Sequence, residues 1–168
     1  ILDFLKKIEA FQAKGFDVIR FDIGDPDFKT PQKIIDAAYK YMHEGFTHYG
    51  PPLGIPKLRE EIAKIHGVES ENIMITPGSK QAMFYALKSI LNPGEEVIIF
   101  VPGWLEYEGP IMLSEGKPVH CKCREDFQPD IDELSKKITS KTKAIIINSP
   151  NNPTGSVYSS ESLKSISE

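Results

Sequence analysis

The sequence lacks several features that would mark a specialised class of protein. No apolar run in its 168 residues approaches the ~20 residues that a membrane-crossing helix needs. Basic side chains do not dominate either, because 20 lysines and arginines stand against 24 aspartates and glutamates, for a net charge of -4. A nucleic-acid-binding protein needs a basic surface to neutralise phosphates. We therefore expect no membrane and no nucleic-acid partner, and a chain long enough to bury one hydrophobic core.

Cysteine is scarce, since the only two are Cys121 and Cys123. Alternate residues of a strand point to opposite faces, so a disulfide between these two thiols would be strained. A metal site would need more ligands at useful spacing, and His120 alone does not complete one. We expect two reduced thiols, no metal and a cytoplasmic protein.

The chain does contain alternating helix-type and strand-type segments. Helices are predicted over 1–13, 31–43, 55–65, 81–91, 104–114, 130–138 and from 159 onward, and strands over 18–23, 73–76, 97–101, 118–123 and 144–148. Strands separated by helices pair in parallel through right-handed crossovers, so the predicted fold class is α/β with a mainly parallel sheet. Thr30 is predicted to cap the second helix, with Pro31 at its first position.

Three loops leave the carboxyl ends of predicted strands, where parallel sheets bind ligands: 77–80, 102–104 and 148–155. Gly78, Ser79 and Lys80 directly precede a helix, whose free N–H groups and dipole favour an anion. A helix cap without any ligand is the simpler alternative, and the spacing is not that of a Walker loop. We therefore treat this join as a candidate anion site.

The other two loops carry aromatic and amide side chains. Trp104 is the only tryptophan, and it either stacks on a planar ligand or packs in the core at the start of a helix. Asn151 and Asn152 either donate to a ligand oxygen or simply form a turn before Pro153. The Asn152–Pro153 peptide bond is a candidate for the cis form.

Five segments, taken in order, resemble motifs of the class I aminotransferases, which are fold type I enzymes that use pyridoxal 5'-phosphate (PLP). They are Ile-Gly-Asp-Pro-Asp-Phe at 23–28, Tyr-Gly-Pro-Pro-Leu-Gly-Ile-Pro-Lys-Leu-Arg at 49–59, Thr-Pro-Gly-Ser-Lys-Gln-Ala at 76–82, Val-Pro-Gly-Trp at 101–104 and Ser-Pro-Asn-Asn-Pro-Thr-Gly at 149–155. The chain is identified on these motifs as the N-terminal portion of an aspartate aminotransferase-like member of class I/II. The resemblance implies a small-domain segment over 1–30 and the first half of the PLP-binding large domain over 31–168.

The resemblance also implies a cofactor site. Gly78, Ser79 and Lys80 would hold the PLP phosphate through backbone amides, and Trp104 would stack on the pyridine ring. Asn152 would hydrogen-bond the phenolic oxygen of the cofactor and strengthen it as an electron sink.

Substrate and partner contacts follow from the same resemblance. Gly24 would lie against the substrate carboxylate, beside Trp104 and Asn152. Tyr49 would reach the phosphate in the neighbouring subunit, which implies a homodimer with shared active sites. Gly103 stands where the family often has an aromatic residue, and we expect a wider substrate pocket there.

The family's reaction needs a lysine that bonds covalently to the cofactor, and none of the seventeen lysines here lies in a matching motif. Without that amine the covalent route is closed. We therefore expect an N-terminal fragment that is inactive alone, of an enzyme that moves an amino group between a 2-amino acid and a 2-oxo acid. The alternatives are a non-catalytic split-gene half or binding module that needs a complementary chain, or another fold type I enzyme such as a β-lyase.

Overall fold

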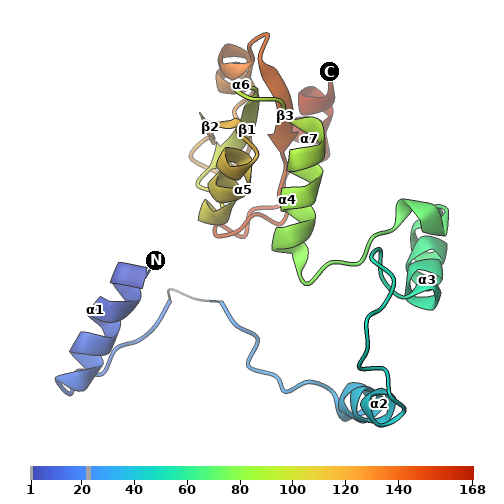
Figure 1. The fold of residues 1–168 in the computed structure, drawn as a ribbon. Coiled ribbons are helices and arrows are strands. Elements are labelled where there is room, and N and C mark those ends of the chain that lie inside the picture. The colour runs from blue at the N-terminus through green and yellow to red at the C-terminus, as the bar shows by residue number, and fades with distance from the viewer. Residues whose placement is uncertain (1, 22–23) are drawn as a thin grey trace. The chain divides into compact units, whose positions relative to one another are not determined.

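The computed structural model describes residues 2–21 and 24–168, which fall into two units, 1–49 and 50–168. The first unit carries two helices, α1 (Leu2–Ala13) and α2 (Gln32–His43), coloured blue in Figure 1. Both agree with the predicted helices. Gly15, with φ of +83°, follows α1, as expected of a residue that can adopt the left-handed conformation.

The second unit contains a three-stranded parallel sheet in the order β2-β1-β3. The strands are β1 (Glu96–Val101), β2 (Lys117–Lys122) and β3 (Thr142–Ile146), and the helices are α3 (Pro56–His66), α4 (Ser79–Ile90), α5 (Glu108–Leu113), α6 (Ile131–Lys137) and α7 (Ser160–Ser167). Short 3-10 turns lie at Ser70–Asn72 (η1) and Leu105–Tyr107 (η2). The parallel α/β fold class predicted from the sequence is thus confirmed.

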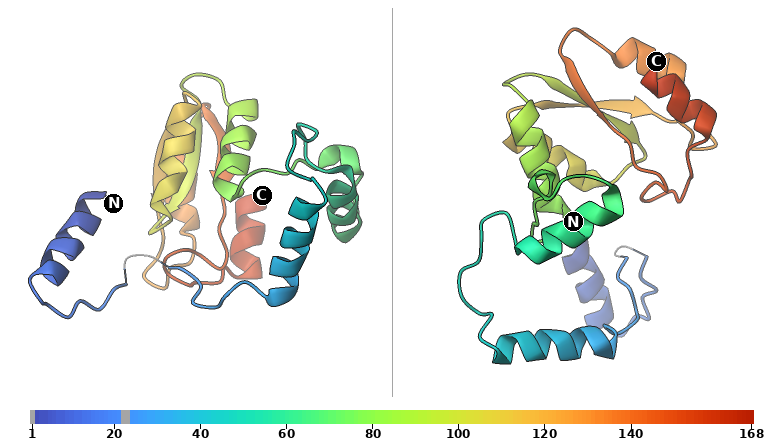
Figure 2. Two further views of the ribbon diagram at one scale, coloured as in Figure 1. Left: turned by 60° about the horizontal axis from the view of Figure 1, so that its bottom comes forward. Right: turned by 90° about the vertical axis from the view of Figure 1, so that its right-hand side faces the viewer.

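The central strand β1 holds the core together. Its residues 97–100 are all apolar and all buried, as expected of a strand covered on both faces. On one face Val97 and Ile99 pack against Leu87 of α4 and Ile111 of α5. The opposite face packs in a second cluster, made of Ile98, Phe100, Cys121, Leu134 and Tyr158. Helices therefore cover both faces of the sheet, as the views of Figure 2 also show.

Local capping explains where the later helices begin. The Asp130 carboxylate accepts a hydrogen bond from the Glu133 N–H at the start of α6. Ser159 does the same for the Ser162 N–H at the start of α7. Each bond satisfies a backbone donor that the helix itself leaves unpaired, and both beginnings agree with the sequence prediction.

Two predicted strands are not formed. Residues 18–21 have no strand partner among the described residues, and positions 22 and 23 of that prediction lie outside the described residues. Residues 73–76 likewise form no strand, and Ile75 N–H donates a single backbone hydrogen bond to the Leu53 carbonyl. A β-strand needs a series of backbone hydrogen bonds to a neighbouring strand. Four apolar residues in the sequence do not show whether such a neighbour is present.

Two helix predictions also need correction. The predicted helix over 104–114 is divided into η2 and α5, because Pro110 has no N–H and its ring disfavours a continuous α-helix through the preceding turn. Thr30 does not cap α2, since the cap position is occupied by Pro31 and no side chain bonds there. The helix begins one residue later than the capping pattern suggested.

Candidate functional site

The candidate site lies in the second unit, beyond the carboxyl ends of β1 and β3. The loop at 102–104 follows β1, and the loop at 148–155 lies just beyond the end of β3. The Asn151 side chain joins the two, since its Nδ2 donates to the Pro102 carbonyl oxygen at 3.0 Å. Parallel strands that lie side by side bring their following loops together, which is why segments almost fifty residues apart in the chain meet here.

The N-terminus of α4 provides the anion-binding part of the site. Gly78 is the N-cap, with φ of +89° and ψ of 160°, and no side chain caps the helix. A Cβ built on Gly78 would meet open space, so the conformation and not crowding requires glycine at this position. The first N–H groups of α4, beginning at Ser79, are therefore placed to receive an anion.

Lys80 and Trp104 lie next to each other, although they are far apart in the sequence. The Lys80 ammonium is 5.7 Å from the centre of the Trp104 ring and 2.7 Å from the Glu106 carboxylate. The ring of Tyr107 meets Trp104 edge to face, with ring centroids 5.3 Å apart. The half-buried indole is thus fixed beside the first turn of α4.

The two asparagines of the 148–155 loop differ in their surroundings. Asn151 is 5% exposed, and its Nδ2 also donates to Thr154 Oγ1 at 2.8 Å. Asn152 has an exposed side chain, while its backbone N–H donates to Asn148 Oδ1 at 2.8 Å. Asn151 therefore anchors the loop, and the Asn152 amide is left accessible to a ligand. The Asn152–Pro153 peptide bond is cis, as are those before Pro102 and Pro150.

The structure brings five of the seven predicted site residues into one unit: Gly78, Ser79, Lys80, Trp104 and Asn152. Gly24 and Tyr49 belong to the first unit, and their predicted roles stay predictions. Gly103 has a close neighbour, because a Cβ there would overlap the Phe100 carbonyl oxygen in this backbone conformation. The wider pocket expected at Gly103 also stays a prediction.

Sequence reasoning missed Glu106 as the partner of Lys80 and Asn148 as the acceptor for the loop backbone. Twenty-six residues separate Lys80 from Glu106, and no periodic pattern relates them. The sequence places Asn148 both at the end of the predicted strand 144–148 and at the start of the predicted loop 148–155, and it lies in the loop because β3 ends at Ile146. An asparagine directly before a Ser-Pro turn is the signal that could have identified Asn148 as an acceptor for the loop backbone.

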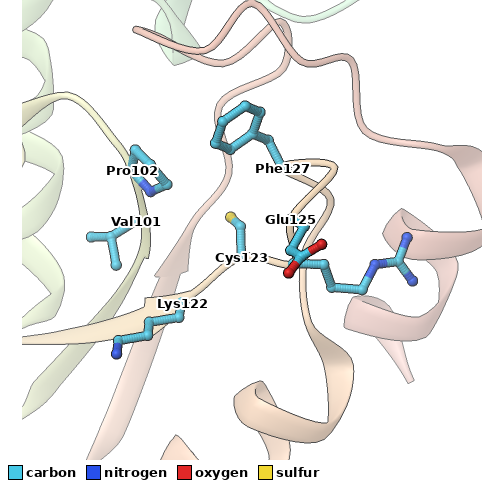
Figure 3. Close-up of a pocket in the computed structure, with 7 residues that line it drawn as sticks. Val101, Pro102, Lys122, Cys123, Glu125 and Phe127 are labelled. Atoms are coloured by element: carbon cyan, nitrogen blue, oxygen red, sulfur yellow. The ribbon is translucent and has the colours of Figure 1, made fainter.

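A second hollow lies at the same edge of the sheet, beyond β1 and β2 (Figure 3). It is an open pocket of about 410 Å³. The residues that line it are Val101, Pro102, Lys122, Cys123, Arg124, Glu125 and Phe127. Burial raises the pKa of the Cys123 thiol, so this side chain is held in its neutral form. The pocket therefore offers an apolar surface and no reactive thiolate.

Both cysteines are free, as the sequence predicted. Burial above all, with nearby Glu133 as a lesser cause, raises the pKa of the Cys121 thiol to about 11. No cluster of three or more metal-binding side chains occurs within residues 2–21 and 24–168. None of the helices in that part of the chain is long and apolar enough to cross a membrane.

The site has the features that a planar, phosphate-bearing ligand needs. The uncapped helix N-terminus suits a phosphate, because its donors lack side-chain acceptors and Gly78 leaves open space beside them. Trp104 offers an aromatic ring for stacking, and Asn152 offers an amide donor. The residue types therefore fit the ligand that the motifs imply.

Comparison with known proteins gives a consistent result. Residues 17–168 match the family described as aminotransferase class I and II. The aspartate aminotransferase of Geobacillus stearothermophilus is 42% identical, over 97% of this chain and 44% of that protein. Among solved structures, the aspartate aminotransferase of Thermotoga maritima superposes with a TM-score of 0.91 at 39% identity, covering 98% of this chain and 46% of that one. The alanine aminotransferase of Pyrococcus furiosus has a TM-score of 0.90 at 35% identity, with 98% and 44% covered. The chain thus spans less than half the length of each of these relatives.

Proposed function

The chain belongs to the class I and II aminotransferase family, and from this we propose that the complete protein moves an amino group between a 2-amino acid and a 2-oxo acid. Enzymes of this family depend on PLP, and the fold superposes on 45% of the chain of a Thermus thermophilus aspartate aminotransferase with a TM-score of 0.92. One observation in this structure supports the proposal most strongly. The uncapped start of α4, the Trp104 ring and the free Asn152 amide occur together at the carboxyl edge of one parallel sheet.

The cofactor contacts that we propose follow from this arrangement. The backbone N–H groups from Ser79 onward donate to the phosphate, and Gly78 allows its close approach. The Trp104 ring supports the flat face of the pyridine, while the Asn152 amide donates to the phenolic oxygen. Bound PLP supplies an electron sink for the negative charge that develops at the substrate α-carbon.

The acidic side chain of Glu106 balances the positive charge of Lys80 in this part of the site. Its carboxylate lies 2.7 Å from the Lys80 ammonium and holds that cation beside the indole. We propose that Lys80 contributes to phosphate binding through its backbone N–H, because its side chain is engaged with Glu106. A lysine in this position is unsuited to covalent attachment to the cofactor.

Substrate and subunit contacts are proposed on the resemblance alone. Gly24 would lie against the substrate carboxylate, and Tyr49 would reach the phosphate of the neighbouring subunit in a homodimer. Residues 1–30 would belong to the small domain and 31–168 to the large domain. Two reduced thiols are consistent with a cytoplasmic enzyme.

The names of the relatives guide the choice of amino donor. Aspartate aminotransferases occur among both the curated relatives and the solved structures, and one solved relative is an alanine aminotransferase. We propose an acidic 2-amino acid as the first donor to test, with alanine and an aromatic amino acid as competitors.

We further propose that the 168 residues alone do not catalyse the reaction. They span about 45% of the length of an aspartate aminotransferase relative, and none of their lysines lies in a motif like that of the reactive lysine. The site that they form binds and orients the cofactor, and the covalent step needs an amine from elsewhere in the complete protein.

The test uses the complete protein. We expect bound PLP to be visible by absorbance, and borohydride reduction followed by mass spectrometry to leave it attached to a lysine. Product formation should require both an amino donor and a 2-oxo acid acceptor, whereas a β-lyase would release its product without any acceptor. If borohydride attaches no cofactor to any lysine, the proposal is wrong.

A further inference from the structure

The side chain of Gln128 uses all four of its usual hydrogen-bonding positions. Its Nε2 donates to Ser156 Oγ at 3.1 Å and to the Val157 carbonyl oxygen at 2.9 Å. Its Oε1 accepts from the Ser159 N–H at 2.9 Å and from Ser162 Oγ at 3.5 Å. A glutamine amide has two N–H donors and an oxygen with two lone pairs, so this side chain is fully paired.

The backbone around Gln128 is itself held in place. Arg124 N–H donates to the Gln128 carbonyl at 2.9 Å, and the Gln128 N–H donates to Asp126 Oδ1 at 3.0 Å. The next residue, Pro129, is fully buried and forms a bridge with Cys123 at the end of β2. Gln128 therefore reaches out from a fixed turn that is joined directly to the sheet.

The segment 156–162, to which the Gln128 side chain is hydrogen-bonded, is connected to the candidate site. The Ser156 carbonyl accepts from the Asn151 N–H at 2.9 Å, and the Asn151 carbonyl accepts from the Gly155 N–H at 2.7 Å. Through Nδ2, Asn151 holds the Pro102 carbonyl of the neighbouring loop. A short chain of hydrogen bonds thus runs from Gln128 through Ser156 to the residue next to Asn152.

A purely structural role at the start of α7 is the simpler explanation for Gln128. That helix, however, already has its own cap, because Ser159 Oγ accepts the Ser162 N–H at 3.0 Å. Tyr158, 4% exposed, also fixes the segment by packing edge to face on Phe100. The two bonds from Nε2 go to Ser156 and Val157, on the loop side of this anchor.

We propose that Gln128 is a positioning residue for the cofactor site: it holds the end of the 148–155 loop so that Asn152 presents its amide to the ligand. This inference rests on the proposed function, since it concerns the same site. It assigns a role to a residue outside the five motifs, on a turn twenty residues before the loop that it holds.

The test replaces Gln128 with glutamate in the complete protein. Gln128→Glu keeps the shape, but an ionised carboxylate has no N–H to donate to Ser156 or Val157. Amide hydrogen exchange at Asn151 and Gly155 should become about tenfold faster, as expected when the two partly exposed hydrogen bonds from the Gln128 amide are lost, while amides of β1 keep their rates. The matched control is Gln12→Glu, which makes the same chemical change at an exposed position of α1.

The second measurement is the absorbance and affinity of bound PLP. Gln128→Glu should raise the PLP Kd several-fold and shift the absorbance in the same direction as Asn152→Ala. Ser156→Ala removes only one acceptor, and it should give a smaller change of the same kind in a protein that folds normally.

The outcomes separate this inference from the proposed function. Wild-type protein that binds no PLP would overturn the proposed function, whereas the exchange rates are measured without cofactor. Unchanged exchange at Asn151 and Gly155 in both Gln128→Glu and Ser156→Ala would overturn the inference. Faster exchange with unaltered PLP affinity and absorbance would overturn it too, because Gln128 would then stabilise the loop without positioning Asn152.

Discussion

At the scale of single residues, the adjacent asparagines Asn151 and Asn152 of the 148–155 loop have different roles. Asn151 is buried and donates to the Pro102 carbonyl and to Thr154 Oγ1. Asn152 exposes its side chain and uses only its backbone N–H, toward Asn148. One side chain therefore stabilises the loop, and the other is available to a ligand.

These different roles predict that alanine at Asn151 affects mainly stability, whereas alanine at Asn152 affects mainly cofactor binding. Asn151→Ala should lower the free energy of unfolding by about 1–3 kcal/mol, because the partly buried hydrogen bond from Asn151 to the Pro102 carbonyl is lost. Asn152→Ala should change that free energy by no more than about 0.5 kcal/mol, yet weaken PLP binding. Urea unfolding and absorbance titration measure the two effects. Equal destabilisation by both variants would contradict the assignment.

Cys121 gives a pH-dependent prediction at the same scale. The thiol is fully buried in β2, and burial raises its pKa from 9.0 to about 11. The folded state therefore keeps this proton when the unfolded state has lost it, so the contribution to stability is intact below pH 9 and falls as pH rises toward 11. Between pH 8 and 10 the loss amounts to about 1 kcal/mol.

The measurement compares wild type with Cys121→Ala by urea unfolding at pH 8 and pH 10. The variant lacks the thiol, so the wild type should lose about 1 kcal/mol more than the variant between the two pH values. Tyrosines and lysines titrate in both proteins and cancel in this difference. An unchanged gap between the two proteins would show that the thiol does not titrate as proposed.

At the scale of elements, the start of α4 depends on the backbone conformation of its cap. Gly78 has φ of +89° and ψ of 160°, which side-chain-bearing residues rarely adopt, although a Cβ would meet open space. We predict that Gly78→Ala costs about 1–3 kcal/mol of stability and moves the first turn of the helix. Affinity for inorganic phosphate and PLP should fall with it.

A matched control is available on α5. Gly109→Ala adds the same methyl group into open space, and Gly109 does not have a positive φ. The control should leave phosphate affinity unchanged, as measured by isothermal titration of both variants. Equal phosphate affinity in Gly78→Ala and wild type would show that the start of α4 does not bind the phosphate.

Element boundaries show which features the sequence could predict. Helix α6 and helix α7 begin where Asp130 and Ser159 predict, because a cap acts over three residues of local chain. The strand predicted at 73–76 failed, because strand formation depends on a partner that the local residues do not specify.

At the scale of the whole molecule, the 168 residues should bind cofactor weakly and without covalent attachment. They hold the proposed phosphate, ring and phenolic-oxygen contacts, but no lysine in a motif like that of the reactive one. We predict that this chain, expressed alone, gives no transaminase turnover and no borohydride-trapped lysine adduct, whereas the complete protein gives both. Enzyme assay and intact-mass measurement test this. A trapped adduct on the isolated chain would identify a reactive lysine among its seventeen.

The sequence by itself determined most local structure, the parallel α/β class and the family resemblance. Apolar periodicity, caps and short motifs act over a few residues, so they can be read without knowing what lies across the fold. For the same reason the sequence placed Trp104 and Asn152 on loops that leave strands, and Gly78 at the start of a helix. The approach of the Trp104 and Asn152 loops to each other follows from the parallel pairing of β1 with β3, and the alternation of elements predicts a parallel sheet.

Tertiary structure alone decided the strand order β2-β1-β3, the pairing of Lys80 with Glu106, and the different tasks of Asn151 and Asn152. It also revealed Gln128, whose four bonds reach residues 28 to 34 positions later in the chain. Such contacts depend on how packed elements place distant segments side by side. Sequence patterns do not encode that placement, because a hydrogen bond between distant residues leaves no regular spacing along the chain.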